Sequence, residues 1–538
     1  MKSSWLDTTV VGQAVRYCTH RAPQVSPKSE DICVETPNDK SRHVNGCSSV
    51  VTCTNPVVRS QKPIVVDWDG PDDKENPQNW PTLYKAWITL LISVYSFVVY
   101  CGSSIIVPSY QGMMLQFGIS DKVASLVLAL YVVGYGTGPL IFSPLSEVAS
   151  IGRNPPYVVS FILFVIISIV LATLNNFPAI VVLRFLQGFF GSPCLATGGA
   201  TVQDITRSWD TIPYLFAAWV SCIYCAPALG PLFASHIVQT RSWHWSLWEI
   251  AMMSGPLCII LICLLPETSA DTILLRRARH RRLHRHGHPE NNPRINHHPT
   301  ILAPSELNPI PFSSILRDSL AHPLEIPLKD PAILFTDLYI SFIYAIYYSF
   351  FEAFHRVYQD LYHMSLVSCS LIFLSIVIGV AVSVVLYILY LVNRSTVQDV
   401  LIANNNFEAC LVPAIPGVCF APIGLFLFAW TARASIHWVV PTVGIAIYIA
   451  ATFVILQAFM LYLPLSYPRY VASLFAANDF SRSASAAVLI MVAPYMYDRM
   501  GISKGVTLLA SISTLGIVGM LLIWWFGANL RARSRFAG

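Results

Sequence analysis

The chain has 538 residues, of which 54% are hydrophobic and only 12% are charged. Its mean hydropathy of +0.56 excludes an ordinary soluble domain, in which about a quarter of the residues are charged. The net charge of +5 carries little information, because in a membrane protein the distribution of Lys and Arg matters more than their sum.

The first 85 residues are polar and rich in Pro, Ser, Thr and Asn. They lack the basic and then apolar pattern of a signal peptide. We expect residues 1–85 to form a disordered cytoplasmic tail.

Twelve apolar runs then follow, each close to the roughly 20 residues that a membrane-spanning helix needs. They lie near residues 86–107, 123–143, 156–174, 177–200, 213–235, 246–265, 333–354, 368–391, 411–431, 438–463, 470–494 and 503–527. The sequence therefore predicts an all-α membrane protein with twelve transmembrane helices in two six-helix bundles, 86–267 and 333–527. Residues 268–332 form a basic linker loop and residues 528–538 a tail, and the positive-inside rule places both in the cytoplasm.

Arg184 lies inside the fourth apolar run. A guanidinium at the centre of a bilayer costs roughly 2.5–3.5 kcal/mol on insertion scales, so it normally faces a polar partner or a watery cavity. Gln187 follows one turn later, and Gly188 allows a neighbouring helix to approach closely. The sequence predicts a tightly packed helix with a polar centre.

The linker loop contains six histidines between His280 and His298. Such a tract could buffer zinc or copper. A basic loop that sets topology and contacts anionic lipid is the better interpretation, because no cysteine or regular ligand spacing accompanies the histidines. We expect no metal site.

Catalytic and nucleotide-binding motifs are missing. The sequence has no GxxxxGK[ST] loop, no HExxH motif and no GxSxG motif. Twelve spans without an energy-transducing domain predict a secondary transporter rather than an enzyme, with its site near the midplane between the halves and no cofactor.

Several motifs resemble those of one transporter family. They are WDGPDD and NPQNW (Asp67 to Trp80), GPLIFSPLSEVASIGRNPPY (Gly138 to Tyr157), RFLQG (Arg184 to Gly188), APALGP (Ala226 to Pro231), WHWSLWEI (Trp243 to Ile250), PETS (Pro266 to Ser269) and YPRYVASLFAANDFSR (Tyr467 to Arg482). Together they resemble the fungal twelve-span drug:proton antiporters of the major facilitator superfamily, from about Asp67 to the C-terminus.

This resemblance implies roles for particular residues. The RxxQG motif implies that Arg184 and Gln187 take part in proton coupling. The first-loop motif with Gly138, and the Gly230-Pro231 motif of exporters, imply helix packing that serves transport. Gly allows close approach and Pro kinks a helix, so we expect Gly230-Pro231 to set how its span packs against the opposite half.

Asp479 and Arg482 are the best-placed ionisable pair in the second half. Asp479 lies near mid-bilayer, where burial and a nearby cation act in opposite directions on a carboxyl group. It could bind the coupled proton, or the two side chains could simply neutralise each other within one helix.

Three charged residues, Glu147, Arg153 and Asp204, lie at the predicted inner ends of their spans. A salt-bridge network among them could close the cytoplasmic side in the outward-facing state. They could equally be ordinary interfacial charges.

Tyrosines are the predicted lining of the substrate cavity, because they suit amphipathic or cationic organic substrates. The candidates are Tyr95, Tyr100, Tyr224, Tyr344, Tyr347 and Tyr348. Tyrosines also gather in the membrane interface, which is the competing interpretation for each of them.

The sequence thus predicts a proton-coupled exporter of small organic compounds such as drugs, toxins or secondary metabolites. An importer or exporter of a nutrient such as a polyamine or sugar is the first alternative, and a non-transporting sensor with a carrier fold is the second. The expected partners are a small-molecule substrate, protons and the lipid bilayer, with no nucleic acid. We expect a monomer in the plasma membrane, with the vacuolar membrane as the alternative.

Overall fold

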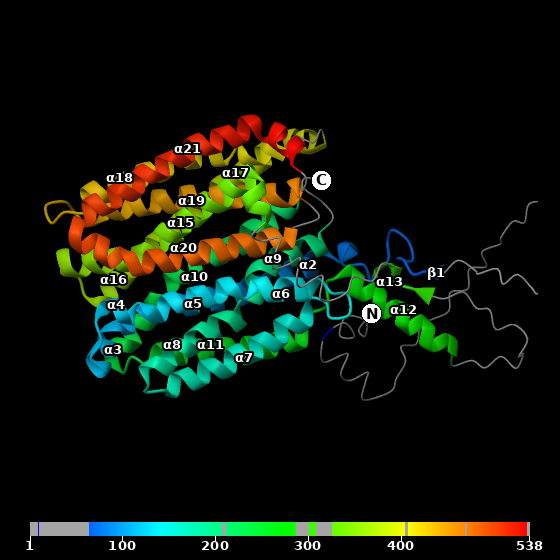
Figure 1. Ribbon diagram of the computed structural model, residues 1–538, viewed down its shortest axis with the longest axis horizontal. Helices are drawn as coiled ribbons and strands as arrows, with labels where there is room; N and C mark the ends of the chain where they lie inside the picture. The colour runs from blue at the N-terminus through cyan, green and yellow to red at the C-terminus, as the bar shows by residue number, and fades with distance from the viewer. Residues whose placement is uncertain are drawn as a thin grey trace, which may run out of the picture.

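A computed structural model describes Thr9 and residues 64–206, 211–286, 301–307, 325–403, 407–467 and 471–534. Long helices run side by side along the longest axis of the molecule (Figure 1). The start of α2, the end of α21 and helix α12 lie at one end, which we call the inner end because the sequence predicts it to be cytoplasmic. Helices α3, α4 and α16 lie at the opposite, outer end.

The helices of the first half cover all six spans predicted there. They are α2 (Thr82–Ser104), η3 (Val107–Ser109), α3 (Tyr110–Phe117), α4 (Asp121–Ala124), α5 (Leu126–Thr137), α6 (Pro139–Glu147), α7 (Asn154–Thr173), α8 (Phe177–Gly191), α9 (Pro193–Ile205), α10 (Ile212–Thr240) and α11 (Trp245–Leu264). Pro139 and Pro193 each begin a new helix one residue after a break, as expected for a residue without a backbone N–H.

The helices of the second half likewise cover the other six predicted spans. They are α15 (Pro331–Phe354), η4 (His355–Leu361), α16 (Leu366–Ile372), α17 (Leu374–Ala403), η5 (Phe407–Leu411), α18 (Ala414–Thr431), α19 (Val439–Ser466), α20 (Val471–Met500) and α21 (Ile502–Arg533).

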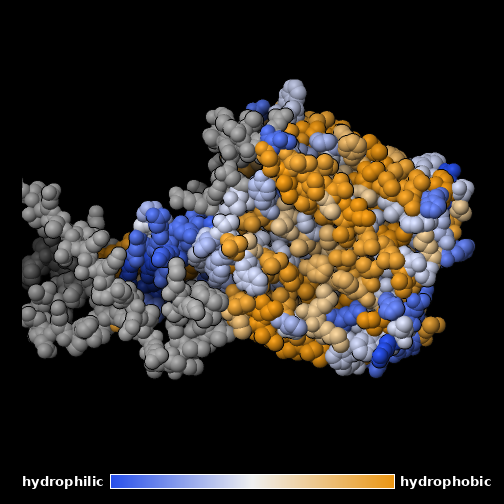
Figure 2. All heavy atoms as spheres, turned by 180° about the vertical axis from the view of Figure 1, so that it is seen from behind, coloured by the Kyte–Doolittle hydropathy of each residue, from blue (hydrophilic) through white to orange (hydrophobic). Residues whose placement is uncertain are grey.

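Among the described residues, ten helical segments are long and apolar enough to cross a membrane. The other two predicted spans are the broken pair α8 and α9, and the more polar α20, which contains Asp479 and Arg482. Figure 2 shows a broad hydrophobic band over the helices, with hydrophilic residues at both ends. This is the surface expected of a protein that crosses a bilayer.

Glycines bring the helices of the first half into close contact. A Cβ on Gly188 in α8 would lie 2.2 Å from the carbonyl oxygen of Tyr131 in α5. A Cβ on Gly134 in α5 would lie 2.2 Å from the carbonyl oxygen of Phe185 in α8. Small residues on both sides therefore let the two backbones touch.

A small folded unit lies at the inner end, outside the bundles. Strand β1 (Ile64–Val65) pairs in parallel with β2 (Ile301–Leu302), beside helices α12 (Ala270–His286) and α13 (Pro304–Leu307). Val66, Leu274, Leu275, Ala278, Ile301 and Ala303 form its hydrophobic core.

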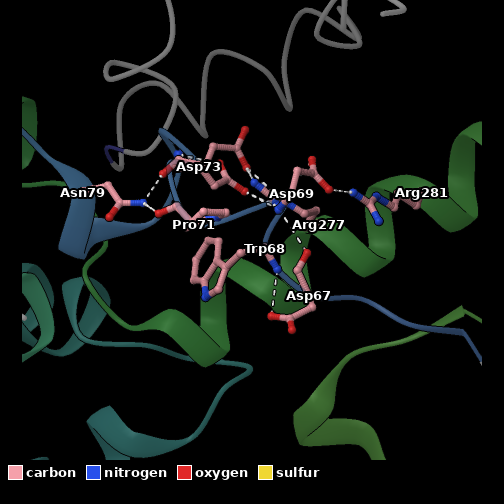
Figure 3. Close-up of polar contacts among 9 residues, drawn as sticks. Asp67, Trp68, Asp69, Pro71, Asp73, Asn79, Arg277 and Arg281 are labelled. Atoms are coloured by element: carbon pink, nitrogen blue, oxygen red, sulfur yellow. Dashed lines mark hydrogen bonds and ion pairs between the residues drawn. The ribbon is translucent and has the colours of Figure 1, made fainter. Parts of the chain in front are cut away.

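Charges hold the N-terminal segment onto this unit, in a contact between residues 64–80 and α12 that we call the inner clamp (Figure 3). Arg277 binds the carboxylates of Asp73 and Glu75, at 2.7 Å each, and Arg281 binds Asp69 at 2.7 Å. Burial alone would raise the pKa of Asp73, but hydrogen bonds from Arg277 and the backbone hold it below the usual value.

The inner clamp corrects the prediction that all of residues 1–85 are disordered. Residues 64–80 are ordered because α12, which lies in the linker, offers them an apolar face and a row of arginines. Residues 1–63, apart from Thr9, and the histidines after His286 lie outside the described residues.

Candidate functional site

A buried ion pair lies where the two halves meet. The Nε of Arg482 donates to Asp479 Oδ1 at 2.8 Å, within α20. The Nη2 of Arg482 also donates to the hydroxyl of Tyr100 in α2, at 2.6 Å. Because Tyr100 belongs to the first half, this hydrogen bond joins the two halves at their centre.

Tyrosine hydroxyls extend the contact between the halves. The hydroxyl of Tyr135 in α5 lies 2.7 Å from that of Tyr344 and 3.1 Å from that of Tyr348, both in α15. Ser103 Oγ lies 3.0 Å from the same Tyr348 hydroxyl. We call these seven residues, Tyr100, Ser103, Tyr135, Tyr344, Tyr348, Asp479 and Arg482, the central network.

The central network is buried. Asp479 is 1% and Arg482 3% exposed, and Tyr100 and Tyr348 are fully buried. A buried ion pair is costly unless its remaining polar atoms are satisfied, yet Asp479 Oδ2 has no hydrogen-bond partner in the described part of the chain. One carboxylate oxygen in the network is therefore available for another partner.

A glycine places α20 against α5. A Cβ on Gly136 would lie 2.3 Å from Cβ of Ser483 and 3.3 Å from the carbonyl oxygen of Asp479. The helix that carries the ion pair thus contacts the first half through a position where only hydrogen fits.

Arg184 is fully buried inside the first half. Its guanidinium donates to the carbonyl oxygens of Gly102 and Ser103, both at 2.9 Å, and of Val127 at 3.3 Å. It also lies over the ring of Tyr131, at 4.3 Å from the centroid. No carboxylate pairs with it among the described residues.

These contacts explain how a cation is tolerated at this depth. Helix α2 ends at Ser104, and the last carbonyls of a helix have no partner within it and carry a partial negative charge. Arg184 therefore caps the C-terminus of α2. Gln187 supports it, because its Oε1 accepts from Arg184 at 3.0 Å and its Nε2 donates to Ser168 at 2.7 Å.

Ser103 connects Arg184 to the central network. Its carbonyl accepts from Arg184, and its hydroxyl contacts Tyr348 of the opposite half. The carbonyl that holds Arg184 and the hydroxyl that contacts the opposite half thus belong to one residue of α2.

Two of the three charged residues predicted at the inner end, Arg153 and Asp204, pair with each other within the first half. Arg153 binds Asp204 at 2.9 Å and donates to Ser146 at 3.0 Å. Among the described residues Glu147 forms no hydrogen bond or ion pair. Glu147 and Arg153 form no ion pair with each other here, so exchanging the two residues would not preserve an existing pair.

Glu267, which the sequence analysis treats only as part of the PETS motif, organises this region. It is fully buried and accepts from the backbone N–H groups of Arg153, Asn154, Thr268 and Ser269 at 3.0–3.3 Å. It therefore ties the start of α7 to the start of the linker.

The sequence analysis expected Gly230 to face the opposite half, but it faces α2 of its own half. A Cβ there would lie 2.4 Å from Ser104 Oγ and 2.8 Å from the carbonyl oxygen of Cys101, both in α2 of the same half. Pro231 removes the N–H that would bond the carbonyl of Pro227, and Ser104 Oγ donates to that carbonyl instead, at 2.6 Å. The motif thus fixes α10 to α2.

Gly138 has a similar role at the break between α5 and α6. A Cβ there would lie 1.9 Å from Ser192 Oγ and 2.7 Å from the carbonyl oxygen of Phe189. The break in span 2 therefore packs against the break between α8 and α9.

The remaining candidate tyrosines divide into two groups. Tyr224 donates to the carbonyl of Thr452 at 3.2 Å, and Tyr347 donates to the carbonyl of Tyr224 at 2.8 Å, so both lie between the halves. Tyr95 lies inside the first half, against the rings of Tyr157 and Phe161.

Open space flanks the central network on both sides. Toward the inner end, a narrow crevice is lined by Trp219, Leu456, Phe475, Asn478 and Arg482. Toward the outer end, a cleft with an empty volume of about 590 Å³, open solvent included, is lined by residues that include Tyr110, Asp121, Pro231, Phe351, Glu352 and Phe373.

Sequence reasoning did not identify Tyr135, Asp121 or Glu352 as site residues. Tyr135 lies between Gly134 and Gly136, which pack α5 against α8 and α20. The sequence does contain a signal for Tyr135, because it is a bulky residue between two glycines and such glycines mark close helix contacts.

Comparison with known proteins identifies the fold and the family. The family model for the Major Facilitator Superfamily matches residues 92–490. The structure of the proton:xylose symporter XylE aligns with a TM-score of 0.56 at 11% identity, over 83% of this chain and 96% of that one, which supports the same fold.

Two fungal proteins are similar over most of their length. "MFS-type transporter pyvG" of Aspergillus violaceofuscus is 42% identical over 90% of this chain and 87% of its own. "Fluconazole resistance protein 1" of Saccharomyces cerevisiae is 35% identical over 97% of this chain and 94% of its own. With its apolar helices and its polar contact between two halves, the chain belongs to the major facilitator superfamily of membrane transporters.

Proposed function

We propose that this protein is a proton-coupled exporter of small organic compounds, such as drugs or secondary metabolites, that works by alternating access. The relatives named as a fluconazole resistance protein and an MFS-type transporter support export. The observation that carries proton coupling is the buried Asp479–Arg482 pair, which is hydrogen-bonded to Tyr100 of the opposite half.

Protonation of Asp479 would change the charge of this pair from zero to +1. An unpaired guanidinium in a dry interior costs several kcal/mol. The protonated site therefore favours an arrangement in which the halves separate and water reaches Arg482. A proton taken up from outside would thus drive the cycle and repel a cationic substrate from the centre.

Arg184 keeps its charge throughout the cycle, because a guanidinium does not release its proton at physiological pH. In this proposal Arg184 and Gln187 position other residues and do not carry the proton. Arg184 holds the end of α2, and with it Ser103 and Tyr100, at the correct place in the central network.

We further propose that the Arg153–Asp204 pair braces the loop between α6 and α7. Glu147 lies beside that loop without an ion pair, so it is available to bind the second half when the inner end closes.

The plasma membrane is the proposed location, because export from the cell requires it. A monomer suffices, because both sides of the central network come from one chain.

The test uses purified protein in liposomes with an imposed pH gradient and fluconazole as the first substrate. Asp479→Asn should abolish accumulation driven by the gradient but retain exchange of labelled for unlabelled substrate, which needs no net proton movement. Asp360→Asn, on an exposed residue of η4, should behave like the unaltered protein. Full gradient-driven accumulation by Asp479→Asn would contradict the assignment.

A further inference from the structure

The outer cleft lies between the two halves. Tyr110 of α3, Asp121 of α4 and Pro231 of α10 line it from the first half, and Phe351 and Glu352 of α15 line it from the second. Residues of both halves therefore face one space, and small-molecule sites occur preferentially at such interfaces between domains.

Two polar side chains in this cleft are buried without a partner. Glu352 is 7% exposed and has no hydrogen bond or ion pair among the described residues. Tyr110 is also 7% exposed, and its hydroxyl has no hydrogen-bond partner within the described ranges. Both groups therefore keep hydrogen-bonding capacity that a ligand in the cleft can use.

The basic residues near the cleft bind another carboxylate. Lys122 lies 3.6 Å from Asp498, and Arg356 also pairs with Asp498. Asp121, the other carboxylate of the cleft, has no ion pair among the described residues. The remaining titratable groups near Glu352 are His355 and Tyr497. Arg356 also lies close enough to Glu352 to attract it electrostatically, but it forms its ion pair with Asp498. Glu352, Asp121 and Asp498 together thus face two cations, Lys122 and Arg356, which leaves an excess of negative charge at the cleft.

The rest of the lining suits an apolar body. Phe351 and Phe373 stack with their ring centroids 5.2 Å apart. Phe351 also packs against Tyr348 of the central network, at 5.6 Å. The cleft thus begins directly beside the central network, on its outer side.

We propose that the outer cleft binds a hydrophobic organic cation, with its charge against Glu352 and Asp121 and its apolar part against Phe351 and Phe373. Resting on the proposed function, this assigns the cleft as the exit subsite, where a cationic substrate is held after it leaves the centre. A neutral substrate gains nothing from the two carboxylates. The cleft therefore distinguishes exported compounds by charge.

Binding of rhodamine 6G, a fluorescent aromatic cation, to the purified protein tests this directly by fluorescence anisotropy at neutral pH. Glu352→Gln should raise its Kd at least about tenfold, a loss of about 1.4 kcal/mol. Glu249→Gln alters a half-buried glutamate in α11, outside the cleft, and should leave the Kd unchanged. An unchanged Kd for Glu352→Gln would overturn the proposal.

Transport separates this proposal from the proposed function. In liposomes with a pH gradient, Glu352→Gln should reduce rhodamine 6G transport and retain transport of the neutral azole fluconazole. Equal loss for both compounds would show that Glu352 serves the transport cycle and not cation binding. If neither compound is transported even by the unaltered protein, the proposed function fails, and the binding measurement still decides the cation site.

A second variant guards against misfolding. Should Glu352→Gln elute as an aggregate in size-exclusion chromatography, Asp121→Asn on the short helix α4 provides the same test. Its side chain is less buried than Glu352, so a smaller rise in Kd is expected, and no rise would contradict the proposal.

Discussion

Arg184 shows how a single buried cation can be stabilised without a carboxylate. Its partners are carbonyl oxygens at the end of α2, the Gln187 side chain and the face of Tyr131. This arrangement satisfies the guanidinium and caps a helix end that would otherwise leave carbonyls unpaired in an apolar interior.

Replacement of Arg184 should therefore reduce stability as well as transport. Arg184→Ala leaves the carbonyls of Gly102 and Ser103 buried and unpaired, which costs on the order of 2–5 kcal/mol in total. The melting temperature of the detergent-solubilised protein should fall, whereas Arg499→Ala, on an exposed residue at the outer end, should not change it. Proton-driven efflux by Arg184→Ala equal to that of the unaltered protein would refute this role.

The polar surroundings of Arg184 could be predicted from sequence, because an arginine in an apolar run is costly unless it meets polar groups. Its partners could not, since backbone carbonyls are present at every position and no residue pattern marks the ones that lie nearby. The surroundings of Glu352 could not be predicted either. The sequence places it at the end of a span, but only the approach of α3 and α4 from the other half encloses it.

At the level of helices, each of the twelve predicted spans coincides with a helix or a broken helix of the structure, although apolar length alone marks only ten of them among the described residues. The breaks within spans also follow from Pro139 and Pro193. The prediction that Gly230 packs against the opposite half was wrong. A glycine indicates that something approaches closely, but its spacing does not say which helix does so, and here α2 of the same half does.

Two glycines in helices, one tightly packed and one open to space, allow a matched test of how much close helix contact contributes to stability. Gly188→Ala places a Cβ 2.2 Å from the carbonyl oxygen of Tyr131, so α8 and α5 must move apart. Gly255→Ala, in α11, meets nothing within 4 Å and gains roughly 1 kcal/mol of helix propensity.

We expect Gly188→Ala to lower the melting temperature and the yield of folded protein, and Gly255→Ala to leave both unchanged or slightly improved. Thermal unfolding of the two purified variants measures the difference. Equal stability of the two would mean that the α5–α8 contact can relax without cost.

At the scale of the whole molecule, the inner clamp attaches part of the linker to the first half. Arg277 holds the segment before α2, and Glu267 holds the start of α7. The two halves can thus move relative to each other while α12 stays with the first. Sequence composition could not predict this unit, because its strands are two residues long and its ion pairs join residues about 200 positions apart.

Removal of the clamp arginine should release the N-terminal segment. Arg277→Ala loses the bonds to Asp73 and Glu75, so limited proteolysis should cut near residues 64–80 faster than in the unaltered protein. Arg279→Ala, on an exposed residue of the same helix, is the control and should be cut at the original rate.

The pH dependence of the clamp has a defined sign. Because the folded pKa of Asp73 lies below the usual value, its contribution to stability is present above the unfolded pKa and is lost as the pH falls through the folded pKa. The difference between Arg277→Ala and the unaltered protein should therefore persist at neutral pH and shrink in acid. A difference that grows in acid would contradict the Asp73 assignment.

Asp498 binds Lys122 of the first half and Arg356 of the second. When the outer ends separate, only the bond to Lys122 is broken, and Asp498 keeps its other cation. The Lys122 and Asp498 side chains are 35% and 42% exposed, and an ion pair so exposed is worth about 0–1 kcal/mol. Opening toward the outside thus breaks a weak ion pair at Asp498 and the contact of Lys122 with the Tyr495 ring, whereas the contacts between the halves at the centre are buried hydrogen bonds.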